Sequence, residues 1–114
     1  MAMHVKLFAL EARTSNATSN DVTVWEKFNA AHIVVDHPNV GGGLTVAVYG
    51  KDLVSNYSYP LLSANIVASG HTVMRIGPDY TAGALVAKEY MPHTFYVAVT
   101  ASGTNFYSIG ASVE

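Results

Sequence analysis

Residues 44–50, LTVAVYG, carry the clearest structural signal in the chain. Three aliphatic side chains, at positions 44, 46 and 48, alternate there with threonine, alanine and tyrosine. Successive side chains of a β-strand point to opposite faces of its sheet, so the pattern predicts a strand with one face directed at a core. Gly41, Gly42 and Gly43 precede it as a flexible turn. The polar segment 51–56 is predicted to be the turn that follows.

The same kinds of residue recur along the whole chain. Valine, isoleucine, threonine, tyrosine and phenylalanine form short runs, and clusters of glycine, proline, asparagine, aspartate and serine separate these runs. No apolar period of 3.6 residues extends beyond one helical turn. Besides residues 44–50, the pattern predicts strands at residues 4–10, 22–25, 29–37, 57–68, 71–76, 93–101 and 105–113.

Two of the short connections are typical of hairpin turns. Ser69-Gly70 joins two predicted strands, and Ser102-Gly103-Thr104 joins the last two. Small polar residues and glycine favour such turns, so both pairs of strands are predicted to be hairpins. Pro60 lies inside the predicted strand 57–68, and because proline cannot donate a hydrogen bond, the first half of that strand is predicted to be an edge or a bend.

These elements predict an all-β fold, a single antiparallel β-sandwich of seven or eight strands. Segments 11–20 and 77–91 lack the alternation and are predicted to be loops, the second with at most one helical turn. Jelly-roll and immunoglobulin-like connectivity both stay open, because strand count alone does not separate them. We expect residues 1–114 to form one domain, since the chain is too short for two.

Composition and charge exclude several classes of protein. The chain has six lysine and arginine residues against eight aspartate and glutamate residues, and no cysteine. It therefore lacks the positive field that holds a nucleic acid, and it has no thiol nucleophile and no disulfide. No apolar run approaches the roughly 20 residues of a membrane span, and the N-terminal apolar run is too short for a signal peptide. We expect a protein made in the cytosol, with no nucleic acid and no membrane as partner.

Residues that could carry catalysis or hold a metal form no recognisable pattern. The histidines, at positions 4, 32, 37, 71 and 93, are candidate ligands together with Asp36, but His32 and Asp36 would lie roughly 13 Å apart along a strand. No serine stands in a G-x-S-x-G nucleophile elbow, and Gly50-Lys51 lacks the spacing of a phosphate loop. We expect no enzyme activity, no metal and no cofactor.

The tyrosines are more informative. Tyr49, Tyr57 and Tyr59 lie around one predicted turn, in a chain with only 12% charged residues. Tyrosine offers a large amphipathic surface and loses little side-chain entropy on binding, so such a cluster suits a protein or carbohydrate contact. The same rings are equally suited to packing the edges of a sandwich with their hydroxyls in water.

Short motifs follow one another in a characteristic order. Ala12-Arg13-Thr14 ends the first apolar segment, a hydrophobic strand at residues 31–36 ends in aspartate, and the strand 45–52 runs into Gly50-Lys51-Asp52. Residues 59–64, YPLLSA, come next, and residues 91–97 and 107–112 close the chain. Through most of the chain, this order resembles small virion structural proteins of tailed bacteriophages.

The resemblance implies a β-sandwich that acts as a capsid decoration, or cement, protein on the surface of the virion. Such a protein binds the outer capsid lattice and stabilises contacts between major capsid subunits. The implied partners are the major capsid protein and further copies of the chain in a homotrimer, where several modest contacts act together. A tail or head-tail position in the virion is the neighbouring possibility. The resemblance implies no catalytic residue.

We expect the contacts to lie on segments that the core does not need, namely residues 4–10 and the loop 77–91. An alternative is a carbohydrate-binding module in which Trp25, or the pair Tyr57 and Tyr59, stacks on a sugar ring. The residues expected to contact a protein partner are Val5, Leu7, Phe8, Tyr57, Tyr59, Tyr80, Leu85 and Tyr90.

Overall fold

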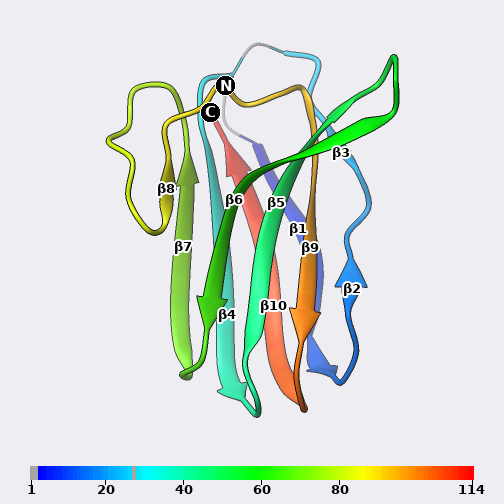
Figure 1. Cartoon of the computed structure of the whole chain (residues 1–114), viewed down its shortest axis with the longest axis vertical. Helices are drawn as coiled ribbons and strands as arrows, with labels where there is room; N and C mark the ends of the chain where they lie inside the picture. The colour runs from blue at the N-terminus through cyan, green and yellow to red at the C-terminus, as the bar shows by residue number, and fades with distance from the viewer. Residues whose placement is uncertain (1–2, 27) are drawn as a thin grey trace.

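The fold is described by a computed structural model for residues 3–26 and 28–114. The described residues form ten strands and no helix, which confirms the prediction of an all-β fold (Figure 1). The count exceeds the predicted seven or eight because two further strands, each of only two residues, lie in segments predicted to be loops. The strands are β1 (Met3–Arg13), β2 (Ala17–Thr18), β3 (Val22–Thr23), β4 (Ala31–Val40), β5 (Leu44–Asp52), β6 (Tyr57–Ile66), β7 (Gly70–Ile76), β8 (Val86–Ala87), β9 (Thr94–Ala101) and β10 (Asn105–Val113).

The strands make two facing layers (Figure 1). The first sheet has the order β1-β10-β4-β7-β8, and the second has the order β2-β9-β5-β6, with β3 also paired to β9. The strand pairs are antiparallel except for β7 with β8, which is parallel. The structure is therefore a sandwich-like arrangement of two mostly antiparallel sheets.

The core lies between the sheets and is built from alternate residues of the long strands. In β5, Leu44, Val46 and Val48 are buried, as the sequence pattern predicted, and the residues between them are half-buried. β9 and β10 alternate in the same way and bring Phe95 and Tyr107 into the centre, both without solvent exposure. Burying an aliphatic or aromatic side chain contributes roughly 1.5–3 kcal/mol, so these inward rows are the main source of stability.

Both predicted hairpins are wrong. β6 pairs with β5 and β7 pairs with β4, so the Ser69-Gly70 connection crosses from one sheet to the other. The connection at Ser102-Gly103-Thr104 also crosses between the sheets, because β9 pairs with β5 whereas β10 lies between β1 and β4. Gly70 and Gly103 have positive φ angles of 145° and 70°, which glycine adopts without strain. The turn residues predicted a reversal of the chain correctly, but not which strand each arm would pair with.

β5 and β6 are consecutive strands that do pair with each other, from Leu44 opposite Ile66 to Asp52 opposite Tyr57. β6 is an edge strand of its sheet, which confirms the prediction made from Pro60. The register shifts between Val48 and Tyr49, next to Pro60, so the ribbon is irregular where the proline lacks a donor.

Two of the predicted loops are partly wrong, since β2 falls within residues 11–20 and β8 within residues 77–91.

Candidate protein-contact surface

The β5–β6 hairpin continues past the two sheets as an arm, which is the upper right projection in Figure 1. We call residues 51–59 the arm. At its tip Leu53 is 53% exposed and Val54 is 96% exposed. Two apolar side chains at the most exposed point of a molecule cost solubility unless they have a partner to cover them. The arm tip is therefore the first candidate for a contact.

The turn that carries these two side chains is held by its own polar groups. The Asp52 carboxylate accepts hydrogen bonds from the backbone N–H groups of Val54 and Ser55, both at 3.3 Å, and from the Ser55 hydroxyl at 2.6 Å. The Ser55 hydroxyl bond, followed by the two backbone bonds, lowers the pKa of Asp52 below its usual value. Asn56 closes the turn at a φ of 62°, a conformation that asparagine tolerates. The apolar tip is thus presented in one defined shape.

The base of the arm is packed closely. A Cβ atom on Gly50 would lie 2.7 Å from the Tyr59 ring and 2.8 Å from Pro92, so only glycine fits there. Tyr59 is half-buried as a result, while the neighbouring Tyr57 is 65% exposed and stacks on it at a centroid distance of 6.3 Å. The glycine of the Gly-Lys-Asp motif therefore has a packing role at the point where the arm leaves the sheets.

Two more exposed aromatic residues belong to segments that meet the base of the arm. Trp25 follows Val24, whose backbone N–H donates to the His93 carbonyl at 2.8 Å, and Tyr90 lies just before Pro92. Trp25 is 78% exposed and Tyr90 is 82% exposed. We define the apolar end as the five exposed residues Trp25, Leu53, Val54, Tyr57 and Tyr90.

β1 supplies less contact surface than the sequence predicted. Phe8 is a core residue, packed edge-on against Tyr107, and we leave it out of the contact surface. Val5 and Leu7 are partly buried against the core. The pairing of β1 with β10 shifts register on both sides of Phe8, and an extra residue at a bulge turns the side chains that follow to the other face. That shift is the reason Phe8 points inward.

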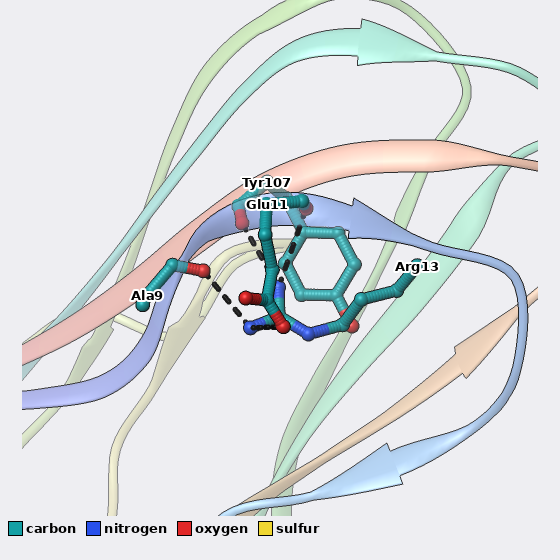
Figure 2. A network of polar contacts seen from close by, with 4 residues as sticks. All are labelled: Ala9, Glu11, Arg13 and Tyr107. Carbon is teal, nitrogen blue, oxygen red and sulfur yellow. Dashed lines mark hydrogen bonds and ion pairs between the residues drawn. The ribbon is translucent and has the colours of Figure 1, made fainter.

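Arg13 holds this irregular edge strand in place (Figure 2). Its guanidinium donates to the backbone carbonyls of Ala9 at 2.9 Å and Tyr107 at 3.1 Å, and pairs with the Glu11 carboxylate at 3.3 Å. The same group lies over the ring of Tyr107, 4.8 Å from its centre, where a cation is attracted to the ring. The arginine of the Ala-Arg-Thr motif is therefore a structural residue.

The loop 77–91 holds three of the predicted contact residues, and two of them, Tyr80 and Leu85, lie apart from the arm. Tyr80 is half-buried because its hydroxyl hydrogen-bonds the His32 ring at 2.9 Å. Leu85 is 37% exposed beside β7, to which its carbonyl is bonded through the Arg75 N–H. The predicted contact residues are thus divided among β1, the arm and this loop. Tyr57 and Tyr90 are the two that the structure brings to the apolar end.

Leu53 and Val54 were not predicted as contact residues, and Trp25 was predicted only as a sugar platform. The signal for the first two was present, since two adjacent aliphatic residues interrupt the otherwise polar turn 51–56. Polar residues are the rule at such a tip, so an apolar pair there indicates a contact rather than a turn preference.

The histidines have separate structural partners. The His71 ring lies 3.2 Å from the Asp36 carboxylate, and the His37 ring contacts the Thr72 hydroxyl at 2.8 Å. Within residues 3–26 and 28–114, no three histidine, aspartate or glutamate side chains come together as metal ligands. His37 is buried in the structure. Over the same residues, no helix is long and apolar enough to cross a membrane.

Two comparisons with known proteins were made, one with family models and one with curated proteins. No family model matches the chain, and a search of curated proteins finds no match either.

Proposed function

We propose that this chain is a capsid decoration protein of a tailed bacteriophage, which binds the outer capsid lattice through its apolar end. The observation that carries the proposal is the arm tip, where a self-bonded turn presents Leu53 and Val54 to solvent. An ordered apolar tip on a charge-poor surface suits a permanent protein partner, because it binds without first paying for ordering of the loop. The motif order along the sequence supports a virion protein in particular.

We further propose that the connectivity is that of a jelly roll. The supporting observation is that β2 and β3 line the same edge, so that each sheet has four strand positions when the short β8 is set aside. Consecutive strands then lie in opposite sheets, except for β5 and β6. Two four-stranded sheets connected in this way are typical of jelly rolls, and viral capsid proteins are among the proteins that use them.

The partners we propose are the major capsid protein and two further copies of this chain. A homotrimer on a three-fold axis of the lattice would place three arms on three equivalent sites. Once the first arm binds, the other two act at high effective concentration, so each contact can be modest. The low charge of the chain fits such binding, because apolar contacts depend little on salt.

The test is co-sedimentation with empty capsids assembled from the major capsid protein of the same phage. The wild-type protein should pellet with capsids in a fixed ratio to the lattice sites, and light scattering should give a trimer in solution. The double variant Leu53→Ser/Val54→Ser should bind at least about tenfold more weakly, because each trimer loses three apolar contacts.

The matched control is Val67→Ser, which changes an equally apolar side chain, 82% exposed, in the β6–β7 connection. It should bind as the wild-type protein does. Absence of the wild-type protein from the capsid pellet would reject the decoration role. Equal binding by the arm variant and the wild-type protein would reject the arm as the contact, whatever the role.

A further inference from the structure

The outer face of the β2-β9-β5-β6 sheet is hollowed into an open groove of about 480 Å³. This volume lies within the range of roughly 300–1,000 Å³ that small-molecule sites occupy. Ala98 gives the groove a low floor, since its methyl group leaves free the space that a larger side chain would fill. The groove is lined by Thr18, Asp21, Tyr49, Lys51, Ser58, Tyr96 and Ala98.

Two tyrosine rings form one wall of the groove. Tyr49 and Tyr96 are direct cross-strand neighbours on β5 and β9, with ring centres 5.3 Å apart and ring planes inclined by only 13°. Stacking the rings on each other fixes both in one orientation, so little side-chain entropy remains to be lost on binding. Such a wall offers a rigid apolar surface to the C–H groups of a flat ligand.

The polar groups of the groove suit a neutral ligand rich in hydroxyls. The Lys51 ammonium lies 2.8 Å from the Asp21 carboxylate, so the charges of the two groups cancel. A free anion or cation would have to break this pair. A hydroxyl group can instead donate to the carboxylate, and the hydroxyls of Thr18 and Ser58 add further donors and acceptors at the rim.

We propose that this groove binds a neutral hexopyranose oligosaccharide, with a sugar ring packed on the Tyr49–Tyr96 wall and its hydroxyls directed at Asp21, Lys51 and Ser58. The groove is open along the sheet rather than enclosed, which suits several linked sugar rings better than a single small metabolite. The site differs from the sugar platforms expected from the sequence, Trp25 and the Tyr57–Tyr59 pair. It is also independent of the capsid contact, because residues alternate faces along a strand and Tyr57 stands on the opposite face of the β5–β6 ribbon from Lys51 and Ser58.

The test is titration of the isotopically labelled protein with cellohexaose, maltohexaose, mannohexaose and chitohexaose, followed by NMR and calorimetry. We expect at least one of the four to bind with a Kd below about 1 mM and to shift the amide signals of Tyr49, Tyr96 and Ala98. Tyr96→Ala should weaken that binding about tenfold, because one stacking face is lost. Ala98→Phe, which fills the floor and leaves both tyrosines in place, should abolish it.

The matched control is Tyr57→Ala, which removes an exposed stacked tyrosine outside the groove and should leave sugar binding unchanged. Ala98→Phe keeps the test decisive if Tyr96→Ala fails to fold. The proposal is overturned if none of the four sugars binds at concentrations up to about 10 mM. It is also overturned if the shifted signals lie outside the groove, or if Tyr57→Ala weakens binding as much as Tyr96→Ala does.

Discussion

The turns at the two ends of the molecule differ in which side chains they bury and which they expose. At the end opposite the arm, the loops 41–43 and 102–104 lie side by side (Figure 1), so closely that a Cβ on Gly41 would overlap the Thr104 carbonyl oxygen. Asn105, fully buried between them, accepts from the Gly41 N–H at 3.0 Å and donates to the Ser102 carbonyl at 3.0 Å. At the arm tip, Asp52 and Ser55 instead bond within their own turn, and the apolar side chains are exposed.

This difference indicates that one end of the molecule contributes to the stability of the fold and the other end to binding. A buried amide that bonds two loops is costly to lose, because its removal leaves an unfilled space and takes the hydrogen-bond partner from backbone groups that are partly shielded from water. Exposed apolar side chains contribute little to folding, since they are in water in both the folded and the unfolded chain. We call Asn105 and the loops 41–43 and 102–104 the Asn105 corner, and we expect substitutions there to lower the free energy of unfolding and substitutions at the arm tip to weaken binding.

The largest loss of stability is expected for Asn105→Ala. The free energy of unfolding should fall by about 3 kcal/mol, because a fully buried side chain leaves a cavity and at least two partly buried backbone groups lose their partner. Urea denaturation at neutral pH measures it. The control is Asn65→Ala, since Asn65 is exposed and bonds only the Thr45 hydroxyl among the described contacts, and a change within about 0.5 kcal/mol is expected there. Equal effects of the two substitutions would contradict the corner as the stabilising end.

The next largest effect is expected for Gly50→Ala, at the base of the arm. The added methyl group would overlap the Tyr59 ring and Pro92, and forcing it in should cost about 2 kcal/mol and tilt the arm. Gly83→Ala is the matched control, because no atom of residues 3–26 and 28–114 lies within 4 Å of its Cβ position, and it should be neutral or slightly stabilising. Thermal unfolding of the two variants compares them directly, and an unchanged melting temperature for Gly50→Ala would argue against close packing at this base.

A smaller, pH-dependent effect is expected for Tyr107→Phe. The Tyr107 hydroxyl is buried and has no hydrogen bond of good geometry to any residue that the structure describes, so removing it should leave stability at neutral pH unchanged or raise it by up to about 1 kcal/mol. Burial raises the pKa of Tyr107, and the nearby Arg13 charge offsets part of the rise.

The raised pKa fixes the sign of the pH dependence. Above about pH 10 the unfolded chain loses this phenol proton while the folded chain keeps it, so this contribution to stability is complete below that pH and is lost as the pH rises through the folded pKa. Urea denaturation between neutral pH and pH values above 10 should show a shallower alkaline decline for Tyr107→Phe than for the wild-type protein. Parallel declines in the two proteins would contradict the assignment to Tyr107.

The smallest effect on global stability is expected for Asp52→Ala, which removes the acceptor of the arm turn. The pKa of Asp52 is lowered in the folded protein, so its carboxylate supports the turn above its usual pKa of 3.8 and this support is lost as the pH falls through the lower folded value. Amide hydrogen exchange should accelerate at Val54 and Ser55 in the variant, while the core strands stay protected. Unchanged exchange at these two amides would show that the turn does not depend on Asp52.

The sequence predicted the parts of the fold that depend on neighbours in the chain. The alternation in residues 44–50 and the edge position signalled by Pro60 are local consequences of strand geometry, and both are confirmed. The pairing of strands is not local, because a Ser-Gly turn reverses the chain equally well within one sheet or between two. Phe8 was misplaced for a related reason, since the bulges that turn it inward arise from the register against β10.

The candidate sites also divide into residues predicted from local sequence and residues that only strand pairing brings together. Tyr57 and Tyr90 were predicted as contact residues from their chemistry alone, and both are exposed at the apolar end. The stacked pair Tyr49 and Tyr96 comes from residues far apart in the chain, and only the pairing of β5 with β9 brings the two rings together. From the sequence, Tyr49 was predicted to lie with Tyr57 and Tyr59 around one turn. The strand register instead puts Tyr49 on the outer face of the sheet.

Cryo-electron microscopy of capsids decorated with this protein tests the central claim most directly. The account predicts density for a trimer on the lattice, with the Leu53–Val54 tips seated on the major capsid protein and the Asn105 corners facing away from it. Density in which the arms point into solvent, while the Asn105 corner or the loop 77–91 touches the capsid, would contradict the account.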